Sequence, residues 1–143
     1  MKRCVLVVAV VLAVALGGVG VTAPASAAPV PATSLALNGS SFWVRLPQCS
    51  GNVRTVLKTD QKRPGTVTVT YIPSRFSRSC HFHVWAGWGL MQPDQIKVPM
   101  VSGPRGGPAV TKTYRTGPGL VTVAFGNRQS MPPSAVSYYV IVP

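Results

Sequence analysis

Short runs of β-branched and aromatic residues recur from residue 42 to the end of the chain, with no helical apolar spacing between them. Each run is bounded by Gly, Pro, Asn or Ser, which is typical of strands separated by tight turns. The runs cover residues 42–46, 53–59, 66–72, 80–86, 95–101, 109–115, 120–126 and 135–142. Seven or eight short strands in about 100 residues predict an all-β, immunoglobulin-like two-sheet sandwich. A small closed β-barrel is the alternative.

Two of these runs alternate so regularly that they assign side chains to faces. In residues 66–72, Val67, Val69 and Tyr71 alternate with three threonines. We expect the valines and the tyrosine to face the core and the threonines to form a polar outer row. Repeated Thr-x-Thr can form an ice-binding or sugar-binding face, but on one strand it is ordinarily the solvated side of a sheet. In residues 120–126 we expect the two valines and Phe125 to face the core.

The amino terminus has the pattern of an export signal. Lys2 and Arg3 precede an unbroken apolar run, and Ala25-Ser26-Ala27 follows as a small-x-small cleavage site. We therefore expect residues 1–27 to be removed as a signal peptide. The alternative is an uncleaved anchor, because about 20 apolar residues can span a bilayer.

The remaining chain has the length of one domain. Residues 28–33 contain two prolines, which disfavour both helix and sheet pairing, so this segment is expected to be an extended spacer. Residues 34–143 are then expected to form a single secreted domain, monomeric and without a transmembrane segment. Cleavage after residue 27 would leave 12 of the 14 basic residues and both acidic residues, a net charge of +10.

The cysteines predict one disulfide. Cys4 leaves with the leader, so Cys49 and Cys80 remain as a pair. In an oxidising compartment an even number of cysteines indicates a disulfide. Two free buried thiols are the alternative.

Residues 80–86 contain the most informative strand. If Cys80 and Phe82 face the core, alternation places His81, His83 and Trp85 together on the opposite face. Two imidazoles two residues apart can converge on a metal ion, and methionine thioethers as further ligands would favour copper. An exposed tryptophan instead indicates a surface that binds a ligand by stacking.

Three residues near this strand complete the candidate ligand site. Trp88 follows Trp85 closely, so the two indoles could lie near the end of one strand. Arg75 and Arg78 alternate with serines and Phe76, and guanidinium groups beside hydroxyls are typical of phosphate or sulfate recognition. A solvated basic surface without a specific partner is the alternative interpretation.

The motifs of common catalytic sites are missing from this sequence. It has no Gly-x-Ser-x-Gly elbow, no His-Glu-x-x-His pair and no phosphate-binding glycine loop. Asp60 and Asp94 are the two acidic residues. The sequence therefore predicts a protein that is not an enzyme and needs no cofactor.

The composition and the candidate residues together favour one function. We expect a secreted, non-catalytic binding module for an anionic target such as a cell-wall polymer or an acidic polysaccharide, with nucleic acid bound only non-specifically. Trp85 and Trp88 would stack on the ligand, Arg75 and Arg78 would hold its acidic groups, and His81 and His83 would add charge in mild acid. The alternatives are an exported copper-binding protein that uses His81 and His83, and a cationic toxin or antimicrobial domain.

Overall fold

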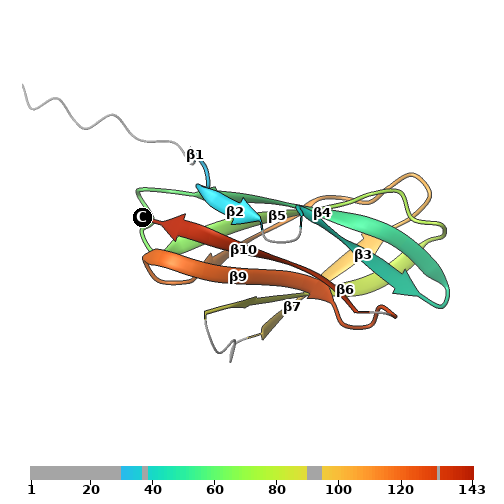
Figure 1. Cartoon of the computed structure of the whole chain (residues 1–143). Helices are drawn as coiled ribbons and strands as arrows, with labels where there is room; N and C mark the ends of the chain where they lie inside the picture. The colour runs from blue at the N-terminus through green and yellow to red at the C-terminus, as the bar shows by residue number, and fades with distance from the viewer. Residues whose placement is uncertain (1–29, 37–38, 90–94, 132) are drawn as a thin grey trace, which may run out of the picture.

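Two antiparallel β-sheets face each other in the computed structural model, which describes residues 30–36, 39–89, 95–131 and 133–143 (Figure 1). The predicted leader, residues 1–27, lies outside the described residues. Sheet A contains β1 (Val30–Pro31), β3 (Ser41–Leu46), β4 (Cys49–Thr59), β5 (Thr66–Pro73) and β8 (Val110–Arg115). Sheet B contains β2 (Ser34–Ala36), β6 (Cys80–Trp88), β7 (Gln95–Ser102), β9 (Gly119–Asn127) and β10 (Ser134–Val142).

The strand order is that of an immunoglobulin-like sandwich. Sheet A runs β1-β4-β5-β8, with β3 also paired to β4, and sheet B runs β2-β10-β9-β6-β7. Consecutive hairpins stay within a sheet. The short strand β2 leaves sheet A and the chain returns to it at β3, and the later changes of sheet fall between β5 and β6, between β7 and β8, and between β8 and β9. The predicted two-sheet sandwich is confirmed, and the sheets do not close into the alternative barrel.

The core lies between the sheets and is built by strand alternation. Along β5, Val67, Val69 and Tyr71 are fully buried while the threonines between them are half-exposed, as their pattern predicts. The Tyr71 hydroxyl lies 2.8 Å from that of Tyr114, and the Tyr71 ring meets Phe125 edge-on with centroids 5.5 Å apart. Burial, with the neighbouring Tyr114 hydroxyl, raises the pKa of Tyr71 far above its ordinary value.

A disulfide joins the two sheets at one end of the sandwich. Cys49 begins β4 in sheet A and Cys80 begins β6 in sheet B, with Cα atoms 6.1 Å apart. Both side chains are buried. The predicted pairing is confirmed, and it anchors the start of β6, the strand that carries the candidate site.

The segment predicted to be an unpaired spacer contributes to both sheets. Val30 and Pro31 pair with Thr59 and Lys58 at the edge of β4, and the Ala32 N–H donates to the Leu57 carbonyl. The following strand, β2, pairs with β10 at the edge of sheet B. The prediction that the prolines exclude sheet pairing is therefore wrong here, because an edge position leaves the proline nitrogen facing away from the neighbouring strand.

Candidate functional site

The candidate site lies on the outer face of sheet B, where β6 runs between β7 and β9. Phe82, Val84 and Ala86 are buried in the core. The intervening side chains therefore lie on the opposite face, where His81 and His83 are exposed and Trp85 is partly buried. The structure thus confirms the predicted orientation of this strand and brings these three residues onto one surface.

Two cations, one from β7 and one from the turn after β9, lie against the Trp85 ring. Lys97 is the direct partner of Trp85 on β7, and its ammonium lies 4.8 Å from the ring centroid. Arg128 follows β9, and its guanidinium carbon lies 5.1 Å from the same centroid. Such distances are those of cation–π interactions. The surface around Trp85 is consequently cationic, which the tryptophan alone did not indicate.

The turn that carries Arg128 is attached to β6 by a buried side chain. Asn127 is 1% exposed and its amide donates to the His83 carbonyl at 2.9 Å. Ser130 donates in turn to the Asn127 side-chain oxygen at 3.1 Å. On the other side of the site, Trp85 faces Gly126 across the β6–β9 pair. These contacts hold Arg128 beside the Trp85 ring rather than leaving it on a free loop.

The cations of this surface have no carboxylate partner among the described residues. Asp60 is the one acidic side chain that the structure describes, because Asp94 lies outside the described residues. The Asp60 carboxylate accepts from the Lys62 N–H at 2.9 Å and lies 3.9 Å from Arg63, on sheet A. Among the described residues, the outer face of sheet B therefore has no carboxylate that compensates its positive charge.

His81 and His83 are the candidate metal ligands. No group of three or more His, Cys, Asp or Glu residues in the described ranges could hold a metal ion. Of the candidate thioethers, Met100 is buried in the core, Met131 is exposed and its N–H donates to the Arg45 carbonyl, and Met91 lies outside the described residues. His81 and His83 face Val101 and Pro99 on β7.

Trp88 does not share the surface of Trp85. It lies three positions further along β6, so alternation turns it inward, where its ring packs 5.3 Å from that of Tyr114. The structure places the second indole at the margin of the core. Trp85 is the tryptophan that β6 presents on the candidate surface.

Arg75 and Arg78 lie in the loop between β5 and β6, apart from Trp85. Phe76 between them is buried and stacks on Phe82, with ring centroids 5.0 Å apart. The hydroxyl oxygens of the adjacent serines accept backbone N–H groups of β4, at 3.0 Å for Ser74 and 2.9 Å for Ser77. These hydroxyls therefore hold the loop in place.

The two arginine side chains of this loop are exposed. From Cys80 to Trp85 the strand advances about 17 Å. The structure therefore does not bring Arg75 and Arg78 to the Trp85 surface, and only an extended ligand could contact both places.

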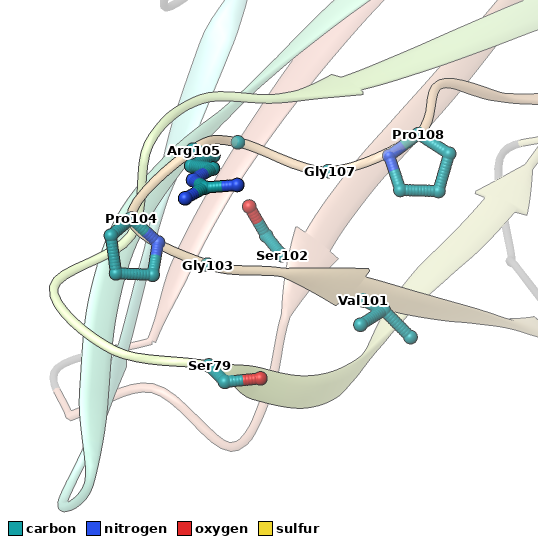
Figure 2. Close-up of a pocket in the computed structure, with 9 residues that line it drawn as sticks. Ser79, Val101, Ser102, Gly103, Pro104, Arg105, Gly107 and Pro108 are labelled. Carbon is teal, nitrogen blue, oxygen red and sulfur yellow. The ribbon is translucent and has the colours of Figure 1, made fainter.

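A separate hollow lies beside the turn that follows β7 (Figure 2). Figure 2 shows the Ser102 side chain between the arms of this turn, with Pro104 and Pro108 at its two ends. The Ser102 hydroxyl donates to the Ser74 carbonyl at 2.8 Å, and Gly103 and Gly106 exchange two backbone hydrogen bonds. Its one charged lining residue is Arg105. These contacts give the hollow a structural role in closing the turn.

Lys97 and Arg128 are the site residues that the sequence interpretation missed. Side chains alternate between the two faces in residues 95–101, so Lys97 lies on the face opposite to that of Val98 and Met100. This outward direction could have been predicted from the sequence. Its contact with Trp85 depends on the register of β6 and β7, which the alternation does not specify. Arg128 depends in addition on the turn held by Asn127.

Comparisons with known protein families, with curated proteins and with solved structures return no match for this chain. Within the described residues, no helix has the length and apolar character needed to cross a membrane.

Proposed function

We propose that this chain is a secreted, non-catalytic module that binds an anionic target outside the cell through the outer face of sheet B. The binding surface consists of Trp85, Lys97 and Arg128, with His81 and His83 beside them. The ligand class is an acidic polymer such as a cell-wall polysaccharide. The proposal rests chiefly on one observation, the placement of two cations against one partly buried tryptophan ring.

The arrangement of the cations favours recognition of negative charge. Lys97 lies on β7 and Arg128 in the turn after β9, on either side of β6, and both have exposed side chains. The tryptophan restricts where their charged groups lie, so less side-chain freedom is lost when an anion binds. We therefore assign Trp85 the role of positioning the two cations and forming an apolar floor between them, instead of open stacking on the ligand.

The absence of counter-charge among the described residues supports the same function. An anion at this surface meets two cations that no described carboxylate neutralises. His81 and His83 lie on the same face. Binding of an anion by exposed cations is expected to weaken with salt.

The test is a binding titration of residues 28–143 against polygalacturonate, duplex DNA and anionic phospholipid vesicles, each over a series of salt concentrations. The site variant is Lys97→Gln/Arg128→Gln. The matched control, Arg105→Gln/Lys112→Gln, removes the same charge elsewhere. We expect the site variant to bind polygalacturonate about tenfold more weakly at about 0.15 M salt, and the control about twofold. Equal losses in the two variants would overturn the proposal.

A further inference from the structure

The outer face of sheet A carries an ordered group of hydroxyls on the opposite side of the sandwich. The threonines of β5 are joined by those of β8, which is paired with it. Five threonine side chains share this face: Thr66, Thr68, Thr70, Thr111 and Thr113. The sequence indicated one threonine row, and the β5–β8 pairing adds a second row beside it.

These hydroxyls are organised in pairs across the two strands. Thr68 lies opposite Thr113 with hydroxyl oxygens 2.9 Å apart, and Thr70 lies opposite Thr111 with hydroxyl oxygens 3.0 Å apart. Each pair uses one of its two hydroxyl hydrogens internally. One donor and several acceptor lone pairs per pair remain for a ligand. Successive pairs lie about 6.5–7 Å apart along the strands.

Cations border the threonine pairs. Lys58 on β4 is the direct partner of Thr68, and Arg115 on β8 is the direct partner of Thr66. Arg63 comes from the turn after β4. All three cationic side chains are exposed. A ligand that lies on the threonines is therefore within reach of positive charge on both sides.

Two neighbouring hollows lie along the threonine pairs and the cations that border them. One has a volume of about 730 Å³ and is lined by Arg63, Thr66, Thr113 and Arg115 among others. The second has a volume of about 380 Å³, and its lining includes Lys58, the remaining threonines and again Arg63 and Thr113. Since the two share these residues, they form one continuous groove, called here the threonine groove.

The acidic residue at the groove is paired with one of these three cations. Asp60 lines the second hollow, but its carboxylate accepts the Lys62 N–H and lies beside Arg63. Lys58 and Arg115 have no carboxylate partner among the described residues. The groove thus combines free cations with hydroxyls that both donate and accept.

We infer that the threonine groove binds a linear acidic polysaccharide. Sugar hydroxyls donate and accept hydrogen bonds, as the threonine pairs do, and the acidic groups of the sugar are matched by Lys58 and Arg115. Among the described residues, no aromatic side chain lines either hollow, so stacking of nucleic-acid bases has no platform there. The described lining also contains no large apolar side chain, which disfavours insertion into a membrane.

This site shares no residue with the Trp85 surface, so either can fail without the other. The ligand class is the one proposed above, and in that respect the inference rests on the proposed function. If both sites bind, one molecule can bridge two polymer chains, because the two sites lie on opposite faces of the sandwich.

The test is calorimetric titration of residues 28–143 with hexagalacturonate, and separately with a short DNA duplex. Thr68→Val/Thr113→Val removes one hydroxyl pair and keeps the side-chain shape, the charge and the preference for a strand. We expect it to bind hexagalacturonate about fivefold more weakly and DNA unchanged. Lys58→Gln/Arg115→Gln should weaken hexagalacturonate binding about tenfold, against about twofold for Arg105→Gln/Lys112→Gln.

Circular dichroism and thermal unfolding of each variant confirm that the fold is retained. The inference is overturned if the valine variant binds hexagalacturonate as well as the parent chain does. It is equally overturned if Lys58→Gln/Arg115→Gln loses no more affinity for hexagalacturonate than Arg105→Gln/Lys112→Gln does. The same holds if hexagalacturonate does not bind the parent chain at low salt. A loss in Lys97→Gln/Arg128→Gln with no loss in either groove variant would support the Trp85 surface and exclude the threonine groove.

Discussion

Lys97 and Trp85 are direct partners across β7 and β6, and the Lys97 ammonium lies 4.8 Å from the centroid of the Trp85 ring. With Arg128 on the same ring, the tryptophan contacts one cation from β7 and one from the turn after β9. This geometry changes what the exposed face of β6 can do. Its tryptophan acts with a pair of cations, so the surface is suited to an acidic ligand.

Replacing Trp85 tests the arrangement separately from the charge. In Trp85→Leu the net charge is unchanged, but Lys97 and Arg128 lose the ring that restrains them. We expect polygalacturonate binding to weaken about fivefold, because each cation–π contact at an exposed site is worth about 0.5–1 kcal/mol. Trp43→Leu is the matched control, since Trp43 is half-exposed on the other sheet and its ring centroid lies 5.5 Å from the Arg45 guanidinium carbon. Equal affinities for the two variants would contradict the role given to Trp85.

The disulfide should contribute measurably to stability. Cys49 and Cys80 are 31 residues apart in sequence, and closing a loop of this length restricts the unfolded chain. We expect Cys49→Ala/Cys80→Ala to lower the free energy of unfolding by about 3–4 kcal/mol. Urea denaturation followed by tryptophan fluorescence measures this difference. The same midpoint for parent and variant would show that the bridge adds nothing.

The loop before β6 should depend on Phe76 and not on the arginines beside it. Phe76 is 2% exposed and stacks on Phe82, so Phe76→Ala should cost about 3–4 kcal/mol of stability. Arg75→Ala, one residue away and exposed, should change stability by less than about 0.5 kcal/mol. Thermal and urea unfolding of both variants provide the comparison. A stable Phe76→Ala would mean that the loop is held by its serine hydrogen bonds alone.

Stability should fall in strong alkali because of the buried tyrosines. Burial raises the pKa of Tyr71, Tyr114 and Tyr138, so each stays protonated in the folded chain at a pH where it ionises in the unfolded chain. The unfolded state then binds fewer protons, and stability falls as the pH rises above about 10, the ordinary tyrosine value.

The Tyr71→Phe variant tests this explanation. It removes the hydroxyl with the largest rise in pKa and breaks the hydrogen bond to Tyr114. We expect lower stability at neutral pH and a shallower decline between about pH 9.5 and pH 11. Denaturant titrations at a series of pH values measure both effects. An unchanged slope would assign the alkaline decline to other groups.

The sequence predicted the local structure well, for identifiable physical reasons. Each of the eight expected strands is present, because alternation and turn residues are local signals that the sandwich does not override. Val67, Val69 and Tyr71 face the core as their spacing indicates. The strands that the sequence did not predict, β1 and β2, are short edge strands whose pairing is set by β4 and β10.

The candidate site was less accessible to sequence reasoning because it depends on contacts between strands. The faces of β6 follow from its alternation, but the approach of Lys97 and Arg128 to Trp85 depends on register and on the turn held by Asn127. For Trp88, its nearness in sequence to Trp85 suggested a shared surface. Because Trp88 is three positions after Trp85, strand alternation predicts that Trp88 faces inward, and the structure has it there.

The most direct test of the central claim is a nuclear magnetic resonance titration of residues 28–143 with hexagalacturonate, followed through tryptophan and backbone N–H signals. The three tryptophans, Trp43, Trp85 and Trp88, provide three indole reporters in separate environments. We predict that the Trp85 indole and the backbone signals of Lys97 and Arg128 shift together and saturate, while the Trp88 indole, packed against Tyr114, does not move. A saturating titration in which the Trp85, Lys97 and Arg128 signals stay in place would contradict the account.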